Sequence, residues 1–139
     1  MRIEVKFKDE VAIMSLSGKF LAGSDGPFLR QKVKDLIDAG TRKMVIDFAD
    51  VPYIDSTGLG FLAGSRVTAQ NAGVSLVLAS INPHVRKILD GVRLTPFFVL
   101  ADDEKSAVTK AGEGLAAGQN PDAVQGKGAK KKRPTASGE

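Results

Sequence analysis

The sequence predicts a single α/β domain with a mixed, mostly parallel sheet of about five strands and helices packed on it. Short apolar runs of strand length alternate with segments whose apolar residues recur at helical spacing, and this order requires crossover connections between parallel strands. The first two runs are separated by only two residues, which predicts an antiparallel hairpin at the sheet edge. The length of 139 residues suits one domain.

The N-terminal hairpin is predicted from a period of two. Ile3, Val5 and Phe7 alternate with charged residues, as in a strand that buries one face. A second apolar run covers residues 11–16, directly after Asp9-Glu10. A tight turn therefore joins two antiparallel strands.

The first helix follows where the period changes from two to about 3.6. Ser24 or Asp25 is placed to cap it, and Pro27 suits its first turn. Gly40 stands where a left-handed residue commonly ends a helix. The apolar residues at helical spacing are Leu29, Val33, Leu36 and Ile37.

Two strand–helix units come next. Residues 44–48 form a short, mostly apolar strand, and 56–72 a helix. Residues 74–79 form the next strand, and Asn82 with Pro83 opens the next helix. The inward face of the first of these helices is predicted to carry Leu59, Leu62, Arg66 and Ala69.

The C-terminal part holds one more strand, a helix and a tail. Residues 97–100 are predicted as the last strand, and Asp102 or Asp103 begins the final helix. From 111 to 139 the chain is rich in glycine, alanine and lysine and has few large apolar residues, too few to offset the entropy of ordering. We therefore predict a domain over 1–110 and a disordered basic tail over 111–139.

The charge gives little support for nucleic-acid binding. The formal net charge is +4, and the tail contributes half of it. The cluster Lys130–Arg133 has two interpretations, a solubilising segment or a contact with an acidic partner or nucleic acid. We expect no direct nucleic-acid binding by the domain.

Composition excludes several chemistries. Cysteine is absent and His84 is the only histidine, which removes disulfides, thiolate catalysis and multi-histidine metal sites. We expect His84 to lie at the surface. No apolar run reaches the length of a membrane span, and no signal peptide is visible after Met1. These observations favour a cytoplasmic, cofactor-free protein that is not an enzyme.

One polar cluster stands out between a strand and a helix. Asp55, Ser56 and Thr57 precede the first apolar turn of the predicted helix, where a side-chain oxygen can accept from free backbone N–H groups. Gly58 and Gly60 leave this helix start without bulk, so another surface can approach its backbone. From the residues alone, the cluster is either a simple helix cap or a functional hydroxyl site.

This segment carries a family resemblance. Residues 54–60, Ile-Asp-Ser-Thr-Gly-Leu-Gly, resemble the signature of STAS domains, in particular the bacterial anti-sigma factor antagonists. The resemblance extends over residues 1–110 and includes the Gly18 turn, the run 82–89 and Leu94-Thr95-Pro96-Phe97-Phe98. It implies the STAS fold.

The resemblance also implies a function. In the family, the first hydroxyl residue of this run is phosphorylated by a partner that is both an anti-sigma factor and an ATP-dependent serine kinase. By that resemblance Ser56 is the phosphorylation site. The partner-binding residues it implies are Asp55, Ser56, Thr57, Gly58, Leu59, Gly60 and Asp25. The unphosphorylated protein would release a sigma factor by binding the anti-sigma factor, and a serine phosphatase would reset it.

The sequence departs from the family at one turn. Many members have an acidic residue in a Gly-x-Leu-Asp pattern after the second strand, whereas here Leu21 follows Gly18-Lys19-Phe20. Asp25 either replaces that carboxylate in partner binding or caps the next helix.

Other functional hypotheses have less support in the sequence. Asp47, Asp50 and Asp55 lie close enough in sequence to suggest a Mg²⁺ site. A hydrogen bond from loop backbone to Asp47 and a turn at Asp50 fit the sequence better. No phosphate-binding loop sequence is present. A hydrolase using Ser56 lacks a plausible base. The main alternative is a non-switching STAS scaffold subunit of a signalling or lipid-transport complex, with Ser56 only part of a cap.

Overall fold

The computed structural model describes residues 2–19 and 25–113. Five strands form one sheet in the order β1-β2-β3-β4-β5. β1 and β2 are antiparallel, and the other neighbouring strands are parallel. The strands are β1 (Arg2–Lys8), β2 (Val11–Ser17), β3 (Lys43–Asp50), β4 (Ser75–Ala79) and β5 (Val99–Ala101). The predicted mixed sheet with an N-terminal hairpin at its edge is confirmed.

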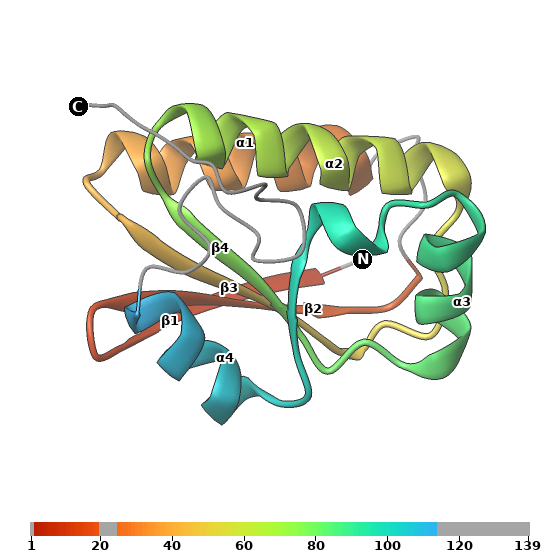
Figure 1. Cartoon of the computed structure of the whole chain (residues 1–139). Helices are drawn as coiled ribbons and strands as arrows, with labels where there is room; N and C mark the ends of the chain where they lie inside the picture. The colour runs from red at the N-terminus through yellow and green to blue at the C-terminus, as the bar shows by residue number, and fades with distance from the viewer. Residues whose placement is uncertain (1, 20–24, 114–139) are drawn as a thin grey trace, which may run out of the picture.

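The helices form layers on both faces of the sheet. They are α1 (Asp25–Asp38), α2 (Ser56–Asn71), α3 (Pro83–Gly91) and α4 (Glu104–Gly112), with a short 3-10 helix, η1 (Thr95–Phe97). Figure 1 shows α1 and α2 side by side over one face, α4 on the opposite face and α3 at one end of the molecule. This arrangement follows from the crossover connections between parallel strands.

The hairpin turn is as tight as the sequence predicts. Asp9 and Glu10 have φ angles of 52° and 68°, so both lie in the left-handed region. Two residues with positive φ are typical of the turn whose twist matches the twist of the flanking strands. Lys8 and Val11 therefore stand opposite each other as the first pair of the ladder.

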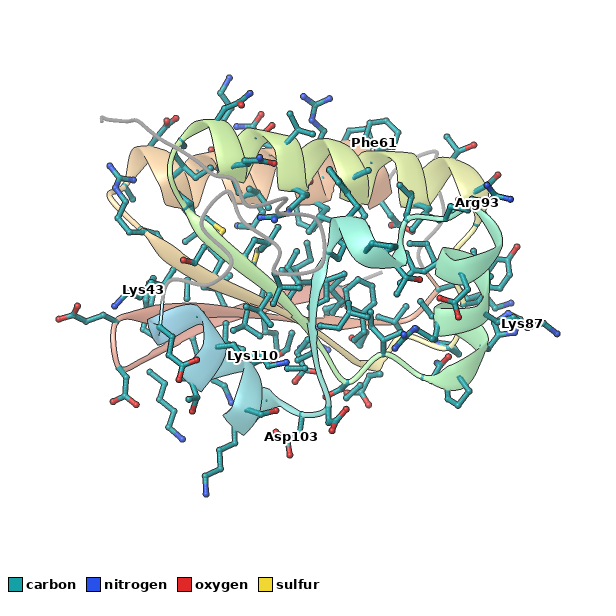
Figure 2. The ribbon with its side chains drawn as sticks, viewed as in Figure 1. Lys43, Phe61, Lys87, Arg93, Asp103 and Lys110 are labelled. Carbon is teal, nitrogen blue, oxygen red and sulfur yellow. The ribbon has the colours of Figure 1, made fainter. Side chains whose placement is uncertain are left out.

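Each face of the sheet has its own apolar core. Ile13, Val45 and Val77 stand side by side on neighbouring strands and pack toward α4. The next residue of each strand belongs to the cluster on the other face, with residues of α1, α2 and α3. Figure 2 shows side chains filling the space between the sheet and the helices. Because both faces are covered, the inner strands are continuously apolar rather than alternating.

Two strand boundaries differ from the sequence prediction. The last strand begins at Val99, because Thr95–Phe97 form η1, with the Phe98 amide bonded to the Thr95 carbonyl at 3.2 Å. Pro96 has no N–H for a strand ladder and suits the first turn of a helix instead. Asp50 was expected beyond the end of its strand and is instead the last residue of β3.

The final helix continues past the predicted domain boundary at 110. Asp103 caps α4 by accepting from the Ser106 amide at 2.8 Å. Ala111 is fully buried against the sheet, and Lys110 donates to the Leu100 carbonyl at 2.6 Å. α4 therefore holds its place through Gly112. The predicted tail from residue 114 onward, the possible cap Ser24 and the turn at 20–23 lie outside the described residues.

Candidate functional site

The loops that follow β2, β3 and β4 meet at one end of the sheet. The Gly18 amide donates to the Asp50 carbonyl at 3.0 Å, which ties the turn after β2 to the end of β3. The Asn82 side-chain amide donates to the Val51 carbonyl at 3.0 Å. The same Asn82 side chain accepts from the Val85 amide at 2.8 Å and so caps α3. One asparagine thereby joins the start of α3 to the loop that leads into α2.

Asp55 is the N-cap of α2. Its backbone is extended, with φ −88° and ψ 169°, and its Oδ1 accepts from the Gly58 amide at 2.6 Å. Val51 and Ile54, on the loop before it, are buried and anchor the entry to the helix. The capping interpretation is therefore correct for Asp55.

The first turn of α2 divides into inward and outward residues. Gly58 and Leu59 are buried, whereas Ser56, Thr57 and Gly60 are exposed. Within the described residues, the Ser56 and Thr57 hydroxyls make no hydrogen bond, so neither is used as a cap. A Cβ added at Gly60 would meet no atom within 4 Å. The turn thus presents two hydroxyls and open backbone to the solvent.

A tyrosine and the single histidine flank this turn. The rings of Tyr53 and His84 lie 5.8 Å apart at 30°, and both side chains are exposed. The surface position of His84 agrees with the sequence analysis. Tyr53 was not predicted as part of the site, because nothing in the local sequence places it beside α3.

Asp25 begins α1 and is only 9% exposed. The next residue, Gly26, lies so close to α2 that an added Cβ would come within 2.2 Å of the Phe61 ring. α1 and α2 therefore approach closely at this end, and a side chain at position 26 would require the Phe61 ring or the helices to move. The burial of Asp25 leaves it little surface for a partner.

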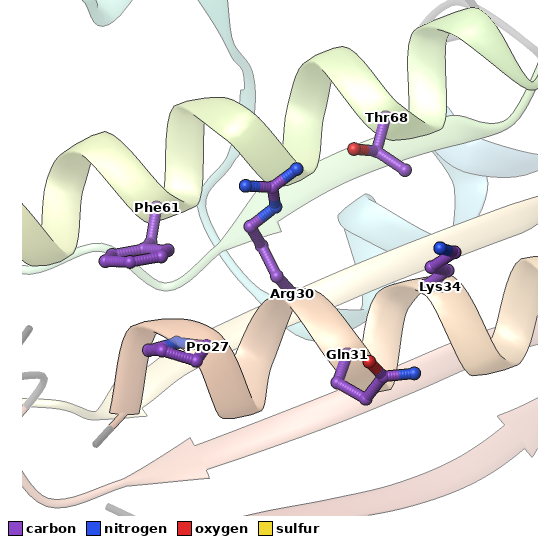
Figure 3. A pocket seen from close by; sticks show the side chains of 6 residues that line it. All are labelled: Pro27, Arg30, Gln31, Lys34, Phe61 and Thr68. Atoms are coloured by element: carbon purple, nitrogen blue, oxygen red, sulfur yellow. The ribbon is translucent and has the colours of Figure 1, made fainter. Parts of the chain in front are cut away.

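A shallow depression and a groove extend from the exposed turn along the seam between α1 and α2. Thr57 and Gly60 line the depression, of about 280 Å³, together with Arg30 and Phe61. Arg30 and Phe61 also line the adjoining groove, where Figure 3 shows the guanidinium of Arg30 reaching from α1 toward α2. Sequence reasoning missed Arg30, since only the packing of α1 on α2 brings it beside Thr57.

The body of α2 is held by buried contacts. Leu59, Leu62, Arg66 and Ala69 are all buried, as the predicted helix face requires. Arg66 is 2% exposed, donates through Nε to the Phe97 carbonyl at 3.3 Å and lies 6.0 Å from the Phe97 ring centre. Burial lowers the pKa of its guanidinium. The helix is thereby linked to η1.

Two of the three carboxylates considered as a cation site, those of Asp47 and Asp55, accept hydrogen bonds from the backbone. Asp47 accepts from the Ala49 amide at 2.9 Å, in agreement with the prediction that it bonds loop backbone. Burial, with Glu104 nearby, raises the pKa of Asp47. Over residues 2–19 and 25–113, no group of three or more histidines or carboxylates is placed to hold a metal ion. In the same part of the chain, no helix has the length and apolar character needed to span a bilayer.

Comparison with known proteins identifies the family of this chain. The sequence model of the STAS domain family matches residues 2–107. The anti-sigma F factor antagonist of Paenibacillus polymyxa is 25% identical over 79% of this chain and 94% of its own. The anti-sigma-B factor antagonist of Bacillus subtilis is 29% identical over 65% of this chain and 81% of its own. These names describe regulatory binding proteins, in agreement with the prediction that the chain is not an enzyme.

The fold agrees with that assignment. The crystal structure of an anti-sigma factor antagonist from Mycobacterium paratuberculosis superposes with a TM-score of 0.67 at 24% identity, covering 80% of this chain and 93% of its own. The chain belongs to the STAS domain family and resembles the anti-sigma factor antagonists within it.

Proposed function

We propose that this chain is an anti-sigma factor antagonist that is switched by phosphorylation of Ser56. When Ser56 is unmodified, the exposed first turn of α2 binds an anti-sigma factor that is also a serine kinase, and the sigma factor is released. Phosphorylation by that kinase ends the binding, and a serine phosphatase restores it. The observation that carries the proposal is the exposed, uncommitted hydroxyl of Ser56 beside a cap that Asp55 already supplies.

The local geometry supports a switch that leaves the fold intact. A phosphate on Ser56 would add about −1.5 to −2 charges at the N-terminus of α2, where the helix dipole favours it by about 0.3–1 kcal/mol. Asp55 is adjacent and opposes it, but its oxygen already accepts from the Gly58 amide. The two effects offset each other, so we expect little change in stability.

We expect a phosphate on Ser56 to weaken partner binding far more than it changes the stability of the domain. A like charge across the interface, about 5 Å from the phosphate, costs roughly 3 kcal/mol per pair of charges at an effective dielectric constant near 20. Since about 1.4 kcal/mol corresponds to a factor of ten, one such contact weakens binding about a hundredfold. Phosphorylation can therefore release the partner without unfolding the domain.

The test is phosphorylation by the cognate anti-sigma kinase, followed by intact-mass and peptide sequencing. We expect one phosphate on Ser56, none in Ser56→Ala, and normal modification of Thr57→Ala, which removes the neighbouring exposed hydroxyl. Equal binding and phosphorylation of Ser56→Ala and the wild type would contradict the proposal. A large stable complex that Ser56→Asp leaves unchanged would favour the scaffold alternative.

A further inference from the structure

Among the described residues, the outer edge of β1 has no strand partner and offers a row of backbone groups for pairing. Residues on the two sides of a two-residue turn exchange both backbone hydrogen bonds, and bonded and non-bonded pairs then alternate along the ladder. Counted from the Lys8–Val11 pair, the even residues of β1 bond to β2. The N–H and C=O groups of Ile3, Val5 and Phe7 therefore point away from the sheet. In the described part of the chain, β1 has β2 as its only strand neighbour.

The side chains of this edge are apolar on one face and charged on the other. Ile3 and Val5 pack half-buried on the α1 side, and Phe7, on the same face, is 63% exposed. No other large hydrophobic side chain of the described residues is more exposed. On the α4 side, Lys6 forms an ion pair with Glu104 at 3.1 Å, and Glu4 forms one with Arg2 at 3.1 Å.

We propose that β1 pairs with β1 of a second copy of this chain, antiparallel and about a two-fold axis at Val5. In that register Val5 faces Val5, and Ile3 faces Phe7 of the second copy. Both pairs use the outward backbone groups, so the hydrogen-bonding pattern of the edge fits the register. The contact joins two five-stranded sheets into one continuous sheet.

The charges are complementary in the same register. Glu4 faces Lys6 of the second copy, and the two-fold axis repeats this pair. Glu4 and Lys6 keep most of their side-chain surface, 68% and 61%, so they remain accessible. Each new pair extends the ion pairs that already exist within one copy. The row runs from Arg2 to Glu4 of one copy and on to Lys6 and Glu104 of the second copy, with charges of alternating sign.

The order of the charges on β1 decides whether they oppose or favour pairing. Charged side chains, lysine above all, and prolines usually protect an edge strand from pairing. Here the like charges, Arg2 and Lys8, face each other only at the exposed ends of the pair, whereas the central positions attract. Opposite charges directly across a strand pair stabilise it, and like charges destabilise it.

Two charge reversals test the register. Glu4→Lys alone places lysine against lysine, and Lys6→Glu alone places glutamate against glutamate, so each variant should lose about tenfold or more in self-association. Mixed together, the two variants place lysine against glutamate at both positions and should associate with each other. Sedimentation velocity and native mass spectrometry of each protein and of the mixture measure this. Lys87→Glu, on the exposed face of α3, is the matched control and should not change the dimer.

Amide hydrogen exchange locates the contact. On raising the protein concentration, the amides of Ile3, Val5 and Phe7 should become protected, whereas those of Glu4 and Lys6 are protected at every concentration. A wild-type protein that stays monomeric at millimolar concentration overturns the proposal. A dimer that survives Glu4→Lys, or that leaves the odd-numbered amides unprotected, also overturns it. Each outcome is independent of the phosphorylation of Ser56.

Discussion

The two halves of α2 have opposite environments. In the first turn, Ser56, Thr57 and Gly60 face the solvent and expose two hydroxyls and open backbone. In the body, Leu62 and Arg66 are almost fully buried, at 1% and 2% exposure. One helix therefore packs into the core along its body and exposes a surface at its first turn. Substitutions in the body should therefore change stability, and substitutions in the exposed turn should change binding.

The largest effect is expected in the body. Leu62→Ala removes a buried side chain from the core under α2 and should lower the free energy of unfolding by about 2–5 kcal/mol. Chemical denaturation followed by circular dichroism measures it. Val67→Ala, at 44% exposure on the same helix, is the control and should change stability by less than about 1 kcal/mol. An unchanged midpoint for Leu62→Ala would mean that this face of α2 is not packed.

Arg66 tests how the body is fastened to the C-terminal part of the chain. Arg66→Ala leaves the Phe97 carbonyl without the donor that now lies at 3.3 Å, and we expect a loss of about 1–3 kcal/mol in unfolding free energy. Thermal and denaturant unfolding give the value. Arg30→Ala removes an exposed arginine from α1 and serves as the control. Equal stability of the two variants would show that the contact with η1 contributes nothing.

Asp55 lies at the start of α2, directly before the exposed turn. Asp55→Ala removes the N-cap of α2 and should cost about 1 kcal/mol, whereas Asp55→Asn keeps an oxygen that can accept from the Gly58 amide and should cost less. Comparison of the two denaturation midpoints distinguishes the loss of the capping hydrogen bond from the loss of the other side-chain contacts. If alanine and asparagine are equally destabilising, the cap is not the reason.

Asp47, which lies in β3 and not in α2, should make the stability of the domain depend on pH. Its folded-state pKa is raised, mainly by burial, so the folded state binds this proton more tightly than the unfolded chain does. Its favourable contribution is present below the ordinary pKa of an aspartate and is lost as the pH rises through the raised pKa. Asp47→Asn should therefore be more stable than the wild type at pH 7, by less than about 1 kcal/mol, and the gain should shrink toward pH 3. Unfolding curves over that range test it, and a gain that grows on acidification would reverse the sign.

The smallest stability effect is expected in the exposed turn. Ser56→Asp should change the unfolding free energy by no more than about 0.5 kcal/mol, because the side chain is solvent-exposed. Its affinity for the anti-sigma partner should nevertheless fall strongly. Melting temperature and isothermal titration on the same preparation compare the two quantities. Loss of stability in proportion to loss of binding would remove the distinction between the two halves of α2.

Local sequence pattern predicted the elements that local physics determines. The period of two in β1, the spacing of Leu59, Leu62 and Ala69 and the capping type of Asn82 depend on near neighbours, and each was confirmed. Where the apolar pattern gave the wrong element, a neighbouring residue favoured a different backbone conformation. Phe97 reads as part of a strand, but Pro96 favours the turn of η1.

Contacts between distant segments were not predictable from the sequence. Arg66 was placed on the inward face of α2, but its bond to the Phe97 carbonyl joins residues 31 positions apart. The same holds for Tyr53 beside His84 and for Arg30 beside Thr57, which depend on how α3 and α1 pack. Of the candidate site, the sequence could therefore indicate the turn itself but not the side chains that surround it.

The bond from Asn82 to the Val51 carbonyl has a consequence for recognition. Because the loop before α2 is already held by the start of α3, the turn that carries Ser56 has little freedom to lose when a partner arrives. Ordering an interface side chain or loop on association typically costs about 0.5–1.5 kcal/mol per immobilised group. Here much of that cost falls on folding rather than on association, so under the proposed function a small contact area would be enough for binding. One phosphate on Ser56 would then be enough to reverse it.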